Sequence, residues 1–357
     1  MNEEQDYVSY LRPDLEEMSG YQPGEQLNIP DIVKLNTNES PYPPSPLVME
    51  TLSRLDYHRL RLYPNPTSDP VREELGKVLC VPPKNIICGN GSDDILNIII
   101  RSFTSPSLPM ACLHPSYSLY PTLAKLNQTP CKMIELTDKF DLPEDLLEQA
   151  KGANLLILTC PNAPTGNSFV MEKVEHICAN FKGIVLIDEA YCDFAWFNCL
   201  FLFPKYKNVI LSRTFSKSRS LAGLRFGYAI AHENIIEGLM KMKDSYNVSY
   251  LTQMLAIASL RDTEYFVECV DKIRYDREIL KDGLTKCGFH VIESSANFLF
   301  AMPPDHNGER CFSELKKRKI LVRYFPGERT GDRVRISVGT NEDVQKVLAA
   351  VSEIYGV

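Results

Sequence analysis

The sequence lacks any run of about 18 consecutive apolar residues, the length that a membrane-spanning helix needs. Its first residues, MNEEQDYVSY, are acidic and polar and do not resemble a signal peptide. The chain also has no excess of basic residues. It contains 39 Lys and Arg and 46 Asp and Glu, which give a formal net charge of −7. Such a balance gives no general attraction for nucleic acid or for an anionic membrane surface. We therefore expect neither as a partner.

Eleven cysteines are present, but the spacings that metal sites and disulfide frameworks use are missing. No two cysteines stand as Cys-x-x-Cys, and no group of Cys and His accompanies them. Cys88, Cys112, Cys160 and Cys178 lie in apolar segments, where cysteine behaves as a small hydrophobic residue. We expect no metal, and free thiols in a reducing cytoplasm.

The length of 357 residues exceeds what one hydrophobic core usually covers, so we expect more than one domain. Apolar runs of strand length alternate with helical patterns such as Met171–Phe181. The expected strands are Asn85–Gly89, Met110–His114, Cys131–Leu136, Asn154–Thr159, Ile184–Asp188, Asn208–Ser212 and Leu224–Ile230. Strands that are buried on both faces and joined by helices predict an α/β fold with a mostly parallel sheet.

The pattern changes near Leu251, where a long, charge-rich helical region begins and continues to Lys286. The strands and the closing helix expected after it are Asn297–Ala301, Ile320–Tyr324, Val334–Val338 and Glu342–Ile354. The N-terminal segment is rich in proline and short of helical pattern, which is typical of an arm lying over the rest of the protein. We predict an arm at 1–40, a large α/β domain at 41–250 and a smaller α+β domain at 251–357.

The segment LSRTFSKSRSLAGLRFGYAI, residues 211–230, has the strongest chemical pattern. Thr214, Ser216 and Arg225 follow a strand, and hydroxyls with a guanidinium can hold a phosphate by charge-assisted hydrogen bonds. Lys217 beside them can condense with an aldehyde if burial and neighbouring cations lower its pKa. The alternative is an ordinary solvated basic loop.

A second segment, IVLIDEAYCDF, ends an apolar run with Asp188. A buried carboxylate needs a partner, and a protonated pyridine nitrogen would be one. Tyr191 comes one short turn later, placed to hydrogen-bond a phenolic oxygen of such a ring. The alternative for Asp188 is a structural carboxylate that caps a helix.

Three further strand ends carry polar or aromatic residues. In GNGSDDIL, the backbone N–H groups of Ser92 and Asp93 can bind a phosphate at a helix N-terminus, whereas a dinucleotide site would need glycine in place of Asp94. Asn162 in TCPNAPTGNS can donate to the phenolic oxygen, and Tyr117 in HPSYSLY can stack on a flat ring. A turn asparagine and a packed tyrosine are the alternatives. All these positions follow expected parallel strands, at the sheet edge where open α/β folds bind ligands.

Together these motifs resemble fold-type I, class I/II pyridoxal-phosphate-dependent aminotransferases, and within them the histidinol-phosphate aminotransferase family. The resemblance covers nearly the whole chain, and the eight-residue step from Lys217 to Arg225 is the spacing that this superfamily uses. The matching segments are KLNTNESPYPPSP (34–46), RLYPNPTSDPVREEL (61–75), GNGSDDIL (89–96), PSYSLY (115–120), PNAPTG (161–166), IDEAYCDF (187–194), FSKSRSLAGLRFGYAI (215–230), ANFLF (296–300), ILVRY (320–324) and VRISVGT (334–340).

The resemblance implies that pyridoxal 5'-phosphate is the cofactor, bound to Lys217 as a Schiff base, with Asp188 paired to its pyridinium nitrogen. Tyr191 and Asn162 would bond the phenolic oxygen, and Tyr117 would stack on the ring. The groups that would hold the cofactor's phosphate are Thr214, Ser216, Arg225 and the amides of Ser92 and Asp93.

On the substrate side, the resemblance assigns Arg335 to the carboxylate of glutamate or 2-oxoglutarate. Tyr21 in GYQPG and Arg323 in ILVRY correspond to residues near the substrate's own phosphate, and Asn38 belongs with the substrate-binding residues. Tyr63 in LYPNP corresponds to a tyrosine lent to the partner's active site, which implies a homodimer.

Two positions depart from the family's pattern. Ala163 stands before the Pro-Thr-Gly turn, where asparagine is common, so Asn162 is expected to supply the amide instead. Arg219 stands where an apolar or aromatic residue is usual, and it adds positive charge near Lys217.

The implied activity is transamination between L-histidinol phosphate and 2-oxoglutarate in histidine biosynthesis, giving imidazole acetol phosphate and L-glutamate. Lys217 would move the proton from the substrate's Cα as general base and acid. A phosphothreonine decarboxylase shares the fold, but the VRISVGT arginine and the LNTNESP opening favour transamination. An aromatic or broad-specificity aminotransferase of the same fold is the alternative that these motifs leave open. A cofactor-sensing regulator would need an added DNA-binding segment, and the acidic arm has no helix-turn-helix pattern.

Overall fold

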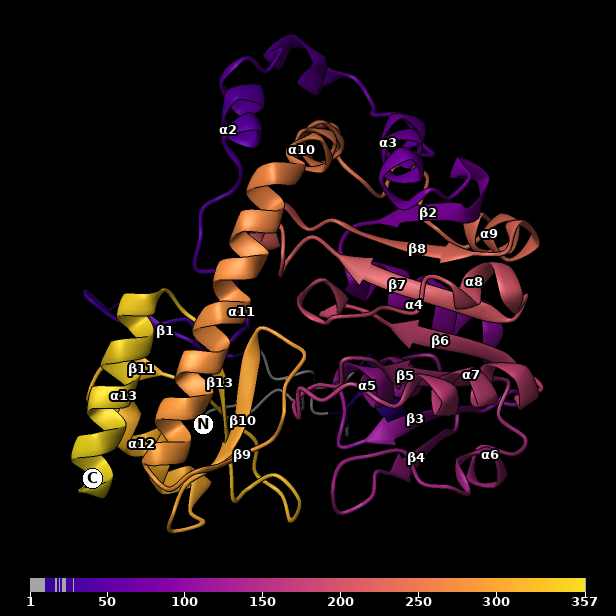
Figure 1. Ribbon diagram of the computed structural model, residues 1–357. Helices are drawn as coiled ribbons and strands as arrows, with labels where there is room; N and C mark the ends of the chain where they lie inside the picture. The colour runs from indigo at the N-terminus through magenta and orange to yellow at the C-terminus, as the bar shows by residue number, and fades with distance from the viewer. Residues whose placement is uncertain (1–9, 17, 19, 21–23, 28, 357) are drawn as a thin grey trace, which may run out of the picture.

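A seven-stranded sheet forms the larger part of the molecule in the computed structural model, which describes residues 10–16, 18, 20, 24–27 and 29–356 (Figure 1). Its strands are β2 (Ile86–Gly89), β3 (Met110–His114), β4 (Cys131–Glu135), β5 (Leu155–Thr159), β6 (Ile184–Asp188), β7 (Val209–Thr214) and β8 (Gly227–Ala231). They lie in the order β2-β8-β7-β6-β5-β3-β4. β8 runs antiparallel to both of its neighbours, β2 and β7, and the other pairs are parallel, so the predicted, mostly parallel α/β architecture is confirmed.

Both faces of the inner strands of this sheet are buried, as their continuous apolar runs predict, whereas the edge strand β4 is largely exposed. In β6, Val185 and Ile187 belong to one apolar cluster and Leu186 to the other, because successive side chains point to opposite faces. Among the helices that contribute to these clusters are α3 (Asp69–Leu79), α4 (Ser92–Phe103), α5 (Leu119–Leu126), α6 (Leu146–Gln149), α7 (Met171–Asn180), α8 (Leu202–Lys205) and α9 (Glu233–Met240).

A smaller antiparallel sheet lies beside the large one (Figure 1). Its order is β12 (Arg323–Tyr324), β13 (Val334–Ser337), β10 (Phe298–Met302) and β9 (His290–Val291). Three helices share its apolar core, namely α11 (Thr263–Lys286), α12 (Gly308–Lys317) and α13 (Asn341–Tyr355). This region has the mixed strand and helix content that the C-terminal sequence predicts.

Two strands have other bounds in the structure than the sequence predicts. The expected strand Ile320–Tyr324 is divided, because β11 (Ile320–Leu321) pairs with β1 (Val33–Lys34) and β12 pairs with β13. The expected strand Leu224–Ile230 begins only at Gly227, because Arg225 adopts a left-handed conformation with φ 55° after a short turn. That turn aims the Arg225 side chain at the sheet edge described below.

The long helical region expected from Leu251 consists of two helices that meet at Asp262. The first, α10 (Tyr250–Arg261), packs against α2 (Pro46–Ser53) and α3, and the second is α11. Another short helix, α1 (Pro13–Glu16), lies within the expected arm.

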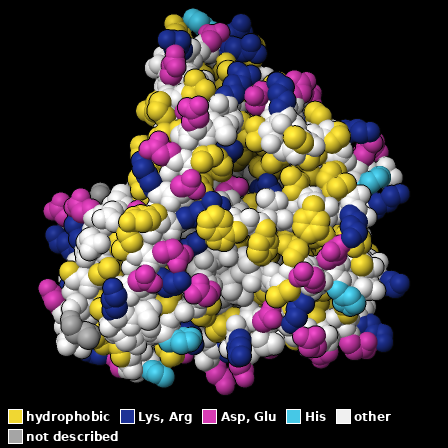
Figure 2. Space-filling model, viewed as in Figure 1, with side chains coloured by type: hydrophobic (Ala, Val, Ile, Leu, Met, Phe, Trp, Pro, Cys, Tyr) yellow, Lys and Arg dark blue, Asp and Glu magenta, His cyan; other side chains and the backbone are white. Residues whose placement is uncertain are grey.

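Of the described helices, none is both long and apolar enough to cross a membrane. Figure 2 shows hydrophobic side chains gathered in the middle and upper part of one face, with both signs of charge scattered around them.

Candidate active site

A cavity of about 380 Å³ opens where β5, β6 and β7 end. Thr159, Asp188 and Thr214, the last residues of these strands, line it on one side. Residues 36–39, the start of α4 and the strands β12 and β13 line it on the others. Among the predicted site residues, those that line this cavity are Asn38, Ser92, Asp93, Tyr117, Asp188, Tyr191, Thr214, Ser216, Lys217, Arg225, Arg323 and Arg335.

Lys217 reaches into this cavity from the turn that follows β7. Its Nζ donates a hydrogen bond to the carbonyl oxygen of Thr37 at 2.9 Å. Burial lowers the pKa of Lys217 to about 8, and the nearby charges of Arg335 and Arg225 act in the same direction. The neutral amine, which is the nucleophilic form, is therefore accessible near neutral pH.

Asp188 lies beneath the cavity and is 3% exposed. Its carboxylate accepts hydrogen bonds from the Tyr120 hydroxyl at 2.8 Å, the Ser212 hydroxyl at 3.2 Å and the Ala190 amide at 3.2 Å. Burial nevertheless raises the pKa of Asp188 to about 6. These three donors are neutral, so a cation in the cavity would favour the charged form of this carboxylate.

Tyr120 is a residue that the motif analysis did not single out. It is fully buried in α5, bonds Asp188 and Thr159, and packs edge-on against Tyr117 with 5.5 Å between ring centroids. The spacing of Tyr117 and Tyr120, three residues apart at a helix start, could have indicated a shared face. Tyr120 thus contacts both Tyr117, which is expected to stack on the cofactor ring, and Asp188, whose carboxylate is expected to bind the nitrogen of that ring.

The expected phosphate site lies between the start of α4 and the Lys217 turn. Arg225 Nη1 donates to the Ser216 hydroxyl at 3.3 Å, which also accepts from Thr214 at 3.0 Å. Gly91 precedes α4 with φ 89°, and a Cβ atom there would come within 2.5 Å of the Arg225 guanidinium. Glycine therefore lets this guanidinium approach the helix N-terminus, where backbone N–H groups bind anions.

The Asp93 side chain occupies a position that the sequence did not predict. Its carboxylate accepts hydrogen bonds from Arg225 at 3.1 Å and from the Tyr117 hydroxyl at 3.2 Å. Only the backbone amide of Asp93 was expected to contribute to the site. In the structure its carboxylate also orients the arginine and the tyrosine.

Tyr191 and Asn38 are in direct contact. The Asn38 amide donates to the Tyr191 hydroxyl at 3.0 Å, and the Asn38 Oδ1 accepts from Ser337 at 2.8 Å. Asn38 has φ 55°, a left-handed conformation that asparagine tolerates better than most residues. The segment before α2 thereby becomes part of the wall next to Tyr191.

The structure does not bring Asn162 into the cavity, contrary to the expectation. Asn162 is fully buried, its amide donates to Pro115 and Thr165, and its Oδ1 accepts from Ser116. Ala163, the next residue, lines the cavity with its methyl group. All of the polar atoms of Asn162 are used to fix the local turn, so Asn162 does not replace the amide missing at Ala163.

Two arginines from neighbouring strands face the cavity opposite the large sheet. Arg323 and Arg335 are directly opposite in the β12–β13 pairing. The Arg335 guanidinium lies 5.2 Å from the ring centres of both Phe298 and Phe325, and it donates to the Asn36 carbonyl at 2.8 Å. Arginine held in this way can bind a carboxylate or a phosphate in a defined orientation.

Tyr63 and Arg219, two other residues singled out in the sequence, lie outside the cavity. Tyr63 is 80% exposed outside the cavity and stacks on Tyr246 with 4.3 Å between ring centroids. Tyr21 lies outside the described residues. Arg219 was expected to add charge near Lys217, but it donates to the Ser259 carbonyl in α10 at 2.7 Å and packs over Phe266 at 4.2 Å. It joins the Lys217 turn to α10 instead of entering the cavity.

Comparisons with known proteins show the family to which this chain belongs. The model of the family "Aminotransferase class I and II" matches residues 30–351. A histidinol-phosphate aminotransferase of Geobacter sp. (strain M21) is 43% identical over 345 residues, which cover 96% of this chain and 98% of that protein. Another from Microcystis aeruginosa is 42% identical over 336 residues, covering 94% and 96%.

Solved structures show the same fold. The histidinol-phosphate aminotransferase from Sinorhizobium meliloti in complex with pyridoxal-5'-phosphate matches with a TM-score of 0.89 at 22% identity, covering 98% of this chain and 99% of that one. Aspartate aminotransferase from Thermus thermophilus with maleate matches with a TM-score of 0.79 at 18% identity, covering 91% and 92%. From the family match and the nearly full-length relatives, we conclude that this chain belongs to the class I and II aminotransferases, the family that includes these histidinol-phosphate aminotransferases.

Proposed function

We propose that this protein is a pyridoxal-phosphate-dependent aminotransferase that converts L-histidinol phosphate and 2-oxoglutarate to imidazole acetol phosphate and L-glutamate. The observation that carries the proposal is one cavity in which Lys217 lies between Asp188 and Arg225 on the large sheet and the pair Arg323 and Arg335 on the small one. The substrate choice is supported by relatives of that name at 43% identity.

The residues of the cavity fit pyridoxal 5'-phosphate. An amine of lowered pKa suits its aldehyde, and the buried Asp188, bonded by neutral donors, suits its ring nitrogen. The hydroxyls of Thr214 and Ser216, the Arg225 guanidinium and the amides that begin α4 suit its phosphate. When bound, this cofactor supplies a ring that accepts electrons from the substrate's Cα.

The chain's own groups then have separate tasks. Lys217 would hold the cofactor through its Nζ, and once free this Nζ would act as the general base and acid that takes the proton from the substrate's Cα and returns it. Asp188 would keep a proton on the ring nitrogen. Tyr117 would stack on the ring, and Tyr191, oriented by Asn38, would hydrogen-bond the phenolic oxygen. Arg335 binds the carboxylate of glutamate or 2-oxoglutarate, and Arg323, with Tyr21, binds the phosphate of the amine.

The rate at which Lys217 condenses with pyridoxal 5'-phosphate is expected to rise with pH through about pH 8, because the neutral amine reacts and the pKa of Lys217 is lowered to about 8. The charge of Glu39 raises that pKa, so Glu39→Gln should shift the midpoint to lower pH. Absorbance of the lysine-bound cofactor, followed after mixing at a series of pH values, measures the midpoint. Glu148→Gln, a change at an exposed site, should leave it in place. A shift upward in Glu39→Gln would contradict the assignment.

Arg323→Ala is expected to lower kcat/KM for histidinol phosphate by about ten- to a hundred-fold and to affect glutamate much less, because a phosphate dianion loses a charge-assisted bond. Arg335→Ala should show the reverse preference. Steady-state kinetics with both amines measures the two ratios. Equal losses for both substrates in Arg323→Ala would mean that Arg323 only supports packing.

The proposal includes a homodimer in which Tyr63 enters the partner's cavity, and the strong exposure of Tyr63 supports this. An equimolar mixture of Lys217→Ala and Tyr63→Ala chains should then regain about a quarter of the wild-type activity, because about half of the dimers are mixed, and one site of each mixed dimer carries both defects while the other carries neither. Activity after unfolding and refolding the mixture tests this. A mixture of Lys217→Ala and Asp188→Ala chains should regain none, since both residues belong to the same chain's site. Equal recovery in both mixtures would refute the shared site.

The choice of substrate is tested by single half-reactions with histidinol phosphate, phosphothreonine, phenylalanine and glutamate. We expect the cofactor's absorbance to change fastest with histidinol phosphate and next with glutamate. A faster change with phenylalanine would favour an aromatic aminotransferase, and carbon dioxide release from phosphothreonine would favour a decarboxylase.

The proposal also includes the domain limits at 1–40, 41–250 and 251–357 and a cytoplasmic location. The cytoplasmic location is consistent with eleven free cysteines.

A further inference from the structure

Two cysteines meet at the far edge of the large sheet, away from the cavity. Cys131 begins β4, the terminal strand, and Cys112 lies in the middle of β3. In the parallel register Cys131 is opposite Met110 and Cys112 is opposite Met133, so the cysteines are diagonal neighbours on one face of the sheet. Their sulfur atoms are 3.6 Å apart.

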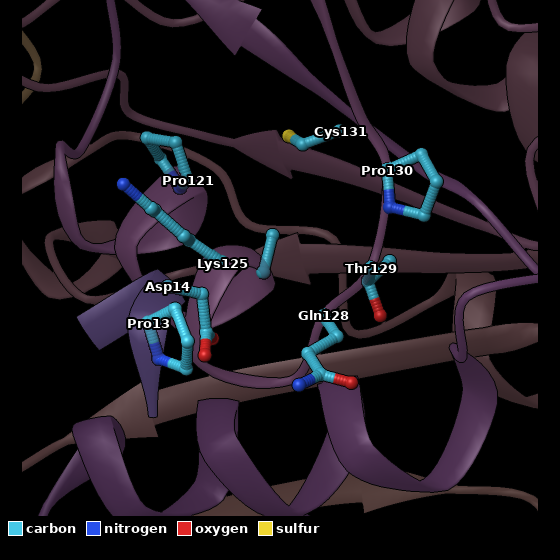
Figure 3. A pocket seen from close by; sticks show the side chains of 9 residues that line it. Pro13, Asp14, Pro121, Lys125, Gln128, Thr129, Pro130 and Cys131 are labelled. Atoms are coloured by element: carbon cyan, nitrogen blue, oxygen red, sulfur yellow. The ribbon is translucent and has the colours of Figure 1, made fainter. Parts of the chain in front are cut away.

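The two thiols differ in their access to solvent. Cys131 lines an open pocket of about 590 Å³ beside Lys125 of α5 and Asp14 of α1 (Figure 3). Cys112, in contrast, is 1% exposed behind it. A second thiol pair, Cys160 and Cys199, is also in contact, but both of its members are buried, at 4% and 1% exposed. Only the first pair thus offers one reachable thiol next to one protected thiol.

We propose that Cys131 and Cys112 form a modification site that hydroperoxides oxidise to an intramolecular disulfide. The Cys131 thiolate attacks the peroxide, an S–O bond forms, the O–O bond breaks, and the alkoxide or hydroxide that leaves takes a proton from water. The Cys112 sulfur then attacks the sulfenic acid, an S–S bond forms, the S–O bond breaks, and water leaves. The dithiol thereby supplies the two electrons that reduce the peroxide.

The environment of each thiol supports this order of events. The hydrogen bond with Cys112 lowers the pKa of Cys131, whereas the same contact and burial raise the pKa of Cys112. Cys131 is therefore the thiol that ionises and attacks first. A disulfide needs sulfur atoms about 2.05 Å apart, so the pair must close by about 1.5 Å. The terminal strand β4 is bonded to β3 on one side only, which leaves it room to shift.

Mass spectrometry of the cofactor-loaded protein after hydrogen peroxide treatment tests the inference. We expect the Cys112 and Cys131 thiols to disappear together, a peptide pair linked through these two cysteines to appear, and dithiothreitol to reverse the link. Cys112→Ser should instead accumulate a sulfenic acid on Cys131, which a 1,3-diketone probe traps, and Cys131→Ser should form no link from Cys112.

Cys199→Ser provides the matched control, because it alters the fully buried pair and should leave the Cys112–Cys131 link unchanged. The exposed Cys80 reports that the peroxide has reached the protein. If Cys80 is oxidised while the Cys112 and Cys131 peptides stay reduced in the wild-type protein, the inference is overturned. Because this outcome is read from the wild-type chain, it holds even if a serine variant folds poorly.

Discussion

Replacing Lys217 with alanine is expected to lower kcat for amino transfer by about 10⁴-fold or more, because the variant loses both the covalent anchor and the group that moves the proton from the substrate's Cα. Borohydride reduction should no longer fix the cofactor to the chain. Steady-state turnover with histidinol phosphate, together with mass spectrometry after borohydride treatment, measures both effects.

The Lys217→Ala variant should remain folded, which separates a chemical role from a structural one. Since the folded-state pKa of Lys217 is lowered to about 8, holding the ammonium in the cavity costs stability below that pH, and the cost disappears as the pH rises from about 8 to the ordinary value of 10.5. Removal of this lysine should therefore not lower the unfolding temperature at neutral pH. Lys207→Ala, in the exposed turn that precedes β7, is the control and should keep full activity. Near-normal turnover in Lys217→Ala would end the central proposal.

Asp188→Asn is the second change with a large expected effect, a loss of about 10²- to 10³-fold in kcat. Asparagine keeps the shape and can still accept a hydrogen bond from Tyr120, but a neutral amide cannot hold a proton on the ring nitrogen. The dissociation constant of the cofactor should rise as well, because an ion pair is lost. Turnover and equilibrium binding of pyridoxal 5'-phosphate measure the two effects.

Ser212→Ala is the matched control for Asp188→Asn. It removes one hydrogen bond at 3.2 Å from the same carboxylate and leaves the charge in place. We expect a small loss of activity, at most about tenfold for one neutral hydrogen bond. If both variants lost activity equally, Asp188 would be acting as a structural acceptor, as a strand-end carboxylate often does.

The local pattern of the chain predicted the elements of the large sheet well. Ile184–Asp188 and Met110–His114 agree with the structure residue for residue, since each is an uninterrupted apolar run followed by a turn. The antiparallel direction of β8 was not predicted, because the direction of a strand depends on its connection to its partners. The division of Ile320–Tyr324 also escaped prediction, since it depends on pairing with Val33–Lys34, far away in the chain.

The prediction of the site residues was limited in the same way, because it too rested on the local pattern of the chain. Strand ends followed by small polar turns identified Asp188, Lys217 and Arg225, because such ends gather at one edge of a parallel sheet. Asn162 was assigned wrongly, because the sequence places it beside Ala163 but does not say which of the two side chains faces the cavity. The structure turns Asn162 inward to Pro115 and Thr165.

The sequence by itself therefore determined the fold class and singled out Lys217 and Arg225, the residues that we propose to hold the cofactor and its phosphate, because these inferences depend on periodicity and on residues close together in the chain. Only the tertiary structure decided the surroundings that set their chemistry. The carbonyl of Thr37, 180 residues from Lys217, accepts its hydrogen bond, and Tyr120, 68 residues from Asp188, donates to its carboxylate. Burial and the charges of distant segments shift a pKa through space, so the reactivity of these groups is established only when the chain has brought them together.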